Sequence, residues 1–543
     1  QDLITGRAHF KSIIESNSLY IDKTEFVYKI ASSAEKFFLL NRPRRFGKSL
    51  FVNTLKSFYQ GEKELFTGLD INNQDWQWEE YPVIHLDYCA VVAESTETLD
   101  KSLGYALERA AGEYDLKLET DTAPRMLKNL ILKLYQKFDK KVVILIDEYD
   151  KPVFASLIDS HSYQFDFEKY ERFQKALKSF YQILEELADH LEKVYLTGII
   201  KFGSSSIFPD SINLVELDQN PEFAELPGFT ESELDQYLTP YFSKLKAKYE
   251  LTTVEAKKAF KDHYFGYRFT EKDIKVYNPF AAARVLDFGS FDNHWFNSGS
   301  PKLLFHLIQR EDFNITRFED LKVEKRKLNP ASIKELTLIP FMYQTGYLTI
   351  KEISAEGLVK LDFPNFEVES NFLINLLDFM TDDKINRVDI YYLRNSLVKN
   401  DEHQFRKYLN SIIDDLKKVA INKSESVKEF YQQIFYLIAK ALSSLYLKVS
   451  SEILNTKETV EFKVKTEDNH FLLSFHYGQK EEIIKQLKAE SETEKDSTYI
   501  SMSFDLQKRE LAESDYINHS FYSAILLKLI FDLFSFIPVI YSC

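Results

Sequence analysis

Cysteine is almost absent from this sequence: Cys89 and Cys543 are the only two in 543 residues. Such a low number excludes a disulfide framework and a cysteine-rich zinc site, and it fits a reducing, cytoplasmic compartment. Basic charge is also in deficit, because 69 Lys and Arg stand against 84 Asp and Glu, a net charge of −15. The chain as a whole is therefore not a polycation for nucleic acid, although a local basic patch stays open.

The sequence also lacks the marks that usually divide a long chain. The first twenty residues have no basic-then-apolar layout, so no signal peptide is visible. We find no internal repeat and no linker rich in Pro, Gly or Ser. Domain boundaries must therefore come from changes in the pattern of apolar residues.

Residues 1–230 alternate strand-like and helix-like patterns. The strand-like runs are FFLL at 37–40, YPVIHL at 81–86, KVVILI at 141–146 and KVYLTGI at 193–199. Continuous apolar runs are typical of parallel strands that are buried on both faces. The fold class is therefore predicted to be α/β, with a P-loop NTPase parallel sheet in this part of the chain.

The pattern changes twice beyond that sheet. Residues 231–400 are mostly helical and are predicted to form a middle or lid region. Residues 401–515 begin with helices and then switch to period-two strands, with a further helix at 480–489, which predicts a small C-terminal α/β module. Residues 516–543 form an apolar tail.

The tail has the length of a membrane span from Phe521 to Cys543. Lys528 and Asp532 lie inside it, and each charge costs about 2.5–3.5 kcal/mol on the insertion scale. We therefore favour a buried terminal helix, or burial against another chain, and keep a membrane anchor as the alternative.

A candidate phosphate-binding loop follows the first strand. It comprises Arg42, Pro43, Arg44, Arg45, Phe46, Gly47, Lys48, Ser49 and Leu50. A helix that begins after Gly47 would point backbone N–H groups at phosphate oxygens. In this arrangement Lys48 reaches the β- and γ-phosphates and Ser49 ligates Mg²⁺. The general pattern has glycine at position 42, where this chain has arginine.

Two acids complete the candidate site about a hundred residues downstream. Asp147 and Glu148 end the VVILI run, at the edge of the sheet where ligands bind in α/β proteins. Asp147 is placed to hold Mg²⁺, and Glu148 is placed to activate water. Thr197, at the end of a third strand, is a candidate neighbour of the γ-phosphate, and Lys201 is a weaker one. ATP and Mg²⁺ are thus the expected cofactors.

Several longer motifs resemble one family of AAA-ATPase-like proteins, whose members usually carry a C-terminal PD-(D/E)XK nuclease-superfamily domain. The motifs are YIDKT at 20–24, RPRRFGKSL at 42–50, IDEYDKP at 146–152, LTG at 196–198, GFT at 228–230, GYRF at 266–269, YNPF at 277–280 and NSGSP at 297–301. In that family RPRRFGKS is the usual form of the loop. The resemblance implies ATP binding and hydrolysis, and it implies that Asp22 and Lys23 lie near the nucleotide.

The resemblance extends more weakly to the C-terminal module. Active members bind Mg²⁺ through an Asp and a Glu-x-Lys on neighbouring strands. Here Glu461 falls at the Asp position and Ser474 and His476 fall at the Glu-x-Lys position, while Glu429 matches an accessory acid. Because Ser474 removes a carboxylate, we predict a degenerate nuclease-like domain that has lost cleavage.

The main hypothesis is therefore a Mg²⁺-dependent ATPase coupled to this domain. Two alternatives stay open: an ATP-regulated nuclease acting on DNA or RNA, and a scaffold that binds nucleotide without hydrolysing it. The sequence names no protein partner, and it leaves nucleic acid binding and an oligomer open.

Overall fold

The computed structural model divides into two compact units. The first comprises residues 1–311 and 320–368, and the second comprises residues 312–319 and 369–543. The structure describes residues 2–3, 6, 9–119, 121–157, 165–201, 207–209, 211–296, 301–330, 336–416, 418–419, 427–443, 450–455, 459–465, 470–477, 497–505, 510–518 and 525–530. Beyond residue 443 the description is one of the backbone alone.

One parallel sheet organises the N-terminal part of the first unit. Its strands are β1 (Phe37–Asn41), β2 (Val83–Asp87), β3 (Val142–Asp147), β4 (Leu191–Gly198) and β5 (Leu214–Glu216). They lie in the order β2-β3-β4-β1-β5. All five residues of β1 and all six of β3 are buried, as the continuous apolar runs predict. The predicted α/β class with a parallel sheet is confirmed.

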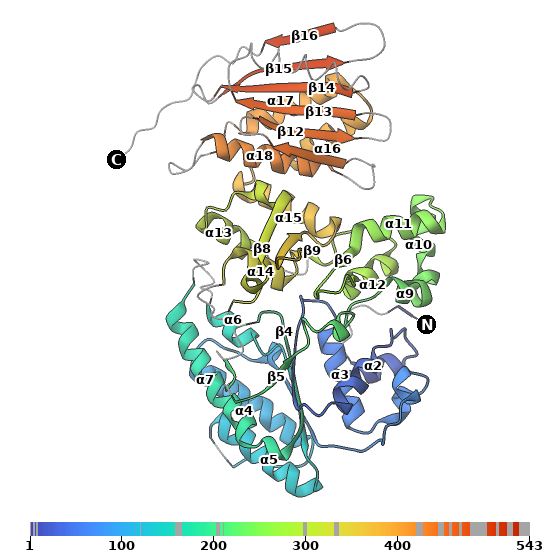
Figure 1. Ribbon diagram of the computed structural model, residues 1–543, viewed down its shortest axis with the longest axis vertical. Coiled ribbons are helices and arrows are strands. Elements are labelled where there is room, and N and C mark those ends of the chain that lie inside the picture. The colour runs from blue at the N-terminus through green and yellow to red at the C-terminus, as the bar shows by residue number, and fades with distance from the viewer. Residues whose placement is uncertain are drawn as a thin grey trace. The chain divides into compact units, whose positions relative to one another are not determined.

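Helices pack against both faces of this sheet. They are α1 (Phe10–Glu15), α2 (Thr24–Ser32), α3 (Lys48–Tyr59), α4 (Thr96–Gly112), α5 (Ala123–Phe138), α6 (Lys151–Leu157) and α7 (Phe167–Glu186). In Figure 1, α2 and α3 lie on one side of the strands, and α4, α5 and α7 lie on the other. Val143 and Leu145 share a core cluster with residues of α2 and α3, so the alternate residues of β3 face the other helices.

The rest of the first unit is mainly helical, as expected from residue 231. Its helices are α9 (Glu231–Glu233), α10 (Ser243–Tyr249), α11 (Thr253–Tyr264), α12 (Pro279–Phe288), α13 (Lys302–Arg310) and α14 (Leu338–Thr345). Its strands are β6 (Phe265–Tyr267), β7 (Val276–Tyr277), β8 (Leu321–Glu324), β9 (Thr349–Ile353) and β10 (Leu358–Asp362). The Thr230 side chain caps α9 in a capping box with Glu233, which the sequence TESE predicts.

The second unit combines helices with a six-stranded sheet. The helix α15 (Phe366–Met380) leads into it, and α16 (Arg387–Val398), α17 (Glu402–Leu416) and α18 (Val427–Leu442) follow. The strands are β11 (Ser450–Asn455), β12 (Thr459–Lys465), β13 (His470–Tyr477), β14 (Ser497–Asp505), β15 (Glu510–Asn518) and β16 (Ile525–Ile530), paired in chain order. Only the β13–β14 pair is parallel among these described strands. The sequence predicts period-two strands in this module, and β11, β12 and β13 are strands in the structure.

The apolar tail differs from its expectation. Residues 525–530, inside the run predicted as a terminal helix, form the edge strand β16 and pair antiparallel with β15. Among the residues that the structure describes, no helix combines the length and apolar character that crossing a membrane requires. The helix predicted at 480–489 and the end of the tail, from residue 531, lie outside the described residues.

Candidate functional site

Polar residues gather at the carboxyl edge of the parallel sheet. The strand register places Asp87 of β2 beside Asp147 of β3, and Asp147 beside Thr197 of β4. Asn41 of β1 pairs with Gly198, one residue further along β4. Because every strand runs in the same direction, the loops that follow them open toward one another.

The loop after β1 turns directly into α3. Gly47, with φ of 92°, precedes the helix in a left-handed conformation that glycine adopts without strain. The Lys48 ammonium donates to the carbonyl oxygens of Arg42 and Pro43, both at 3.0 Å. Burial lowers the pKa of Lys48, and Asp147 and Glu148 oppose that effect. Leu50, in the first turn, packs against the core cluster.

Asp147 is a buried carboxylate at the end of β3. Only 4% of the residue is exposed, and its Oδ1 atom has no hydrogen-bond partner among the described residues. Burial raises the pKa of Asp147 to about 6, while the nearby Ser49 hydroxyl and Lys48 ammonium lower it. The contributions of Ser49 and Lys48 show that the loop and the acid strand face each other.

Glu148 follows in a left-handed conformation, with φ of 55°. Its Oε2 atom accepts a hydrogen bond from the Cys89 thiol at 2.9 Å and lies 3.9 Å from the Lys151 ammonium. Burial, then the contact with Glu148, raises the pKa of Cys89 to about 12, so the thiol stays protonated. Sequence reasoning missed Cys89 as a site residue, although its place just after β2 was the available signal.

The side chains of Thr197 and Lys201 have different surroundings. Thr197 is fully buried beside Asp147, and its hydroxyl has no hydrogen-bond partner among the described residues. The Lys201 ammonium pairs with Glu216 and lies 3.9 Å from Asp218 Oδ2. Thr197 therefore faces the candidate site, whereas Lys201 pairs with acids on and just after β5.

Arg42 has carbonyl partners far along the chain. Its guanidinium donates to Leu226 O at 3.0 Å, Asp218 O at 2.9 Å, Phe223 O at 3.1 Å and its neighbour Asn41 O at 3.1 Å. Arg42 is 1% exposed and lies 4.2 Å from the centroid of the Phe269 ring. Burial lowers its pKa to about 10. These contacts tie the start of the loop to residues 218–226.

Residues from the middle region hold the other half of the loop. Arg44 donates to the Tyr347 hydroxyl at 3.2 Å, and its carbonyl oxygen accepts from the Trp295 indole at 3.1 Å. Arg45 is exposed and lies over the Phe280 ring at 4.9 Å. Phe46 is fully buried, with its ring centroid 4.9 Å from that of Tyr267. The YNPF and GYRF motifs are thus partners of the RPRRF loop.

Trp295 is itself anchored by a buried acid. Its backbone N–H donates to Glu367 Oε1 at 2.7 Å, and burial raises the pKa of Glu367 to about 8. The folded protein therefore holds the Glu367 carboxyl proton more tightly than the unfolded chain, so the free energy of unfolding falls as the pH rises from about 5 to 8.

We expect Glu367→Gln to remove this contribution and to raise the urea midpoint at pH 8 relative to the unsubstituted protein. If the difference between the urea midpoints at pH 5.5 and pH 8 were the same in Glu367→Gln as in the unsubstituted protein, the assignment would be wrong.

Asp22 and Lys23 are held by contacts of their own. The Asp22 carboxylate accepts from the Thr24 backbone and hydroxyl at 2.8 and 2.7 Å, and from Asp70 N at 2.7 Å. The Lys23 ammonium forms an ion pair of 2.5 Å with Glu233. The nearness to nucleotide that the family resemblance implies stays a prediction for both.

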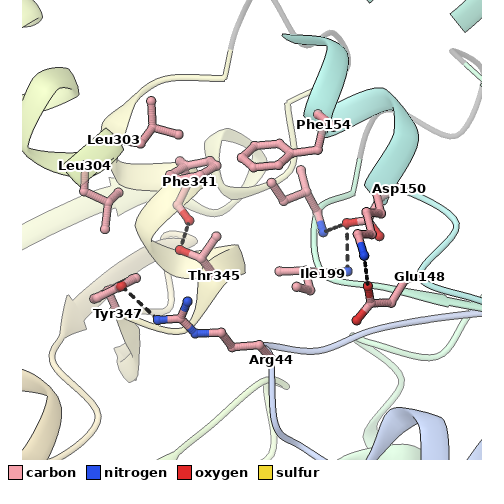
Figure 2. Close-up of a pocket in the computed structure, with 13 residues that line it drawn as sticks. Arg44, Glu148, Asp150, Phe154, Ile199, Leu303, Leu304, Phe341, Thr345 and Tyr347 are labelled. Atoms are coloured by element: carbon pink, nitrogen blue, oxygen red, sulfur yellow. Dashed lines mark hydrogen bonds and ion pairs between the residues drawn. The ribbon is translucent and has the colours of Figure 1, made fainter. Parts of the chain in front are cut away.

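A cavity of about 650 Å³ lies beside Glu148. Arg44, Glu148, Asp150 and Lys151 contribute its charged side chains. Figure 2 shows Arg44 and Glu148 along one edge, with Phe154, Phe341, Leu303 and Leu304 along the other. Apart from the loop and acids named above, no local sequence pattern indicates this cavity, because its walls come from α6, α13, α14 and the segment that follows β4.

The predicted nuclease-like positions fall on described backbone. Glu461 of β12 pairs directly with Ser474 of β13, and Thr459 pairs with His476. Glu429 is exposed in the first turn of α18. The side chains of Glu461, Ser474 and His476 lie outside the described part of the structure.

No group of three or more His, Cys, Asp and Glu side chains that would hold a metal ion occurs among the described residues. Mg²⁺ needs no such cage, since it keeps several waters and is usually bound through one or two carboxylates plus substrate phosphates. The donor set of Asp147 and Ser49, with a partnerless carboxylate oxygen, fits an ion bound in that way.

Three comparisons with known proteins found similarities to this chain. An uncharacterised protein from the vnfD 5′ region of Azotobacter chroococcum mcd 1 is 28% identical over 374 residues, 67% of this chain and 68% of that one. Drosophila ORC bound to Cdc6 and GC-rich DNA aligns at 11% identity and a TM-score of 0.22, over 79% of this chain and 61% of that chain. Drosophila ORC bound to Cdc6 and poly(dA/dT) DNA aligns at 10% identity and a TM-score of 0.22, over 79% of this chain and 61% of that chain. Residues 5–208 match the family described as Predicted AAA-ATPase.

Proposed function

We propose that the protein is a Mg²⁺-dependent ATPase whose reaction takes place at the carboxyl edge of the parallel sheet. One observation supports this most directly: β1 and β3 flank β4 in parallel, so the loop that carries Lys48 and Ser49 and the acids Asp147 and Glu148 leave the sheet at the same edge. A cation, a hydroxyl and two acids in this arrangement suit a nucleoside triphosphate with its metal.

Each group has a distinct role in this proposal. The Lys48 ammonium exchanges the carbonyl oxygens of its own loop for phosphate oxygens, which are stronger acceptors. Asp147 and Ser49 would hold Mg²⁺, which supplies charge stabilisation to the phosphates when bound. Glu148 orients a water molecule and takes its proton as the water attacks the γ-phosphorus. The buried Thr197 hydroxyl lies where it can donate to the γ-phosphate.

The Lys48→Ala variant tests nucleotide binding. Because the ammonium is buried and would make charge-assisted bonds to phosphate, its loss should weaken binding of a non-hydrolysable ATP analogue with Mg²⁺ by about 100-fold. Isothermal titration calorimetry measures this change. Lys56→Ala, on the same helix but paired with Glu113, is the matched control and should bind as the unsubstituted protein does. Equal affinities of both variants would exclude the proposed phosphate site.

We further propose that the C-terminal sheet is a nuclease-like domain without cleavage activity. The register supports it, because the direct neighbour of Glu461 on β13 is Ser474 rather than a second acid. Mg²⁺- or Mn²⁺-dependent cutting of DNA or RNA that Glu461→Ala abolishes would instead establish the ATP-regulated nuclease.

A further inference from the structure

The cavity beside Glu148 is amphipathic. Its apolar walls include Phe154 and Phe341, whose rings stack with centroids 5.6 Å apart and an interplanar angle of 16°. Leu303 and Leu304 extend this surface (Figure 2). A volume of about 650 Å³ lies within the range of roughly 300–1,000 Å³ that is typical of small-molecule sites.

The two carboxylates at the polar end already have partners. Asp150 Oδ2 accepts from the backbone N–H groups of Ile199 and Ile200, at 2.9 and 2.7 Å. Glu148 accepts from Cys89 and faces Lys151. The amide hydrogen bonds satisfy Asp150 Oδ2, and Lys151 partly neutralises Glu148.

Arg44 has more donors than acceptors. Its guanidinium carries five N–H groups, and its hydrogen bond to the Tyr347 hydroxyl uses one of its nitrogens. Among the described residues, no carboxylate oxygen lies within 4 Å of this guanidinium. The Arg44 Nε atom also has no hydrogen-bond partner among these residues, so the donors left to be matched at this end of the cavity belong to Arg44.

We propose that this cavity binds a small organic anion with an apolar, ring-sized body. The body packs against the stacked rings of Phe154 and Phe341 and against Leu304, and its carboxylate, sulfonate or phosphate group accepts hydrogen bonds from Arg44. This site shares Arg44 with the candidate phosphate-binding loop and Glu148 with the acid pair, but it does not include Lys48, whose ammonium donates to its own loop carbonyls.

A ligand in the cavity also affects the proposed reaction. Glu148 lines the cavity, so an occupant excludes water from one side of this carboxylate. Occupancy should therefore slow ATP hydrolysis, and this second part of the inference rests on the proposed function. The binding itself does not, because it requires no nucleotide.

The experiment compares two fluorescent probes without nucleotide. 1-Anilinonaphthalene-8-sulfonate carries an anionic group on an aromatic body, and N-phenyl-1-naphthylamine has nearly the same body without the charge. We expect saturable binding of both at one site, with the sulfonate bound about tenfold more tightly. Arg44→Leu should remove this preference and leave the affinity for the uncharged probe unchanged. Circular dichroism checks that this variant is folded.

A cavity-filling variant gives the control. Ala155 is exposed on α6 and lines the cavity, so Ala155→Phe should weaken both probes at least about tenfold. Ala247→Phe, at an exposed position of α10 outside the cavity, should bind both as the unsubstituted protein does. Equal binding by the Ala155 and Ala247 variants, or a sulfonate preference that survives Arg44→Leu, would overturn the proposal. Probe binding without ATP hydrolysis would support the site and reject the proposed function alone.

Discussion

Replacing Glu148 by glutamine should lower the turnover of ATP by about 10²–10³-fold while nucleotide binding stays within about twofold. Glutamine preserves the size and the polar end of the side chain but cannot accept a proton from water. Lys48, Ser49 and Asp147, which are proposed to bind the nucleotide and its metal, remain in place. Phosphate release under saturating ATP measures turnover, and titration with a non-hydrolysable analogue measures binding.

Glu64→Gln is a suitable control for this experiment, because Glu64 is an exposed acid at the surface of the same unit. It should hydrolyse ATP at the unsubstituted rate. If Glu148→Gln and Glu64→Gln both retained full turnover, the proton acceptor would have to be another group. If neither form hydrolysed ATP but both bound it, the non-hydrolysing scaffold would be the better description.

Replacing Arg42 by methionine should lower the free energy of unfolding by about 4 kcal/mol. The guanidinium donates to four carbonyl oxygens at the interior end of the loop. Methionine fills a similar volume but leaves these buried acceptors without donors, and each costs about 1–3 kcal/mol before the structure relaxes. Arg42→Lys should also lower the free energy of unfolding, because a single ammonium cannot reproduce the planar fork of donors. Urea denaturation followed by circular dichroism measures the change.

The neighbouring arginine provides the comparison. Arg45 is exposed and contacts the Phe280 ring, so Arg45→Met should change stability by no more than about 0.5 kcal/mol. If the Arg42→Met protein were fully stable but bound ATP weakly, the result would instead support the phosphate-binding role that the position of Arg42 in RPRRFGKS predicts.

Strands with strong local signals could be predicted from the sequence. FFLL and VVILI are apolar at consecutive positions because β1 and β3 are covered on both faces, and both were expected. β5 was not, because Leu214–Glu216 is too short for any periodicity and is only partly buried. In the tail, apolar residues with two charges were compatible with a helix, whereas pairing with β15 over Ile525–Ile530 is a long-range property.

The candidate site also contains residues that could be predicted from the sequence and residues that could not. Lys48, Asp147 and Glu148 follow from local patterns, because Lys48 begins the helix after the loop and the two acids lie where β3 ends. The contacts of Arg42 join residues about 180 positions apart, so no local pattern could reveal them. The sequence around Trp295 suggests no function for it. Its indole nevertheless contacts Arg44 of the loop, 251 positions away in the chain.

The central position of β4 has a consequence for control of the proposed ATPase. This strand is hydrogen-bonded to β1 on one side and β3 on the other, and the ladder continues past both strands through Arg42 N to Gly198 O and Tyr149 N to Thr197 O. Sliding either neighbour by one residue would invert its faces and expose core side chains. The spacing between the loop and the acids is thus as rigid as the sheet itself. A signal that switches activity on or off must instead act through rotamers and loops beyond the strand ends.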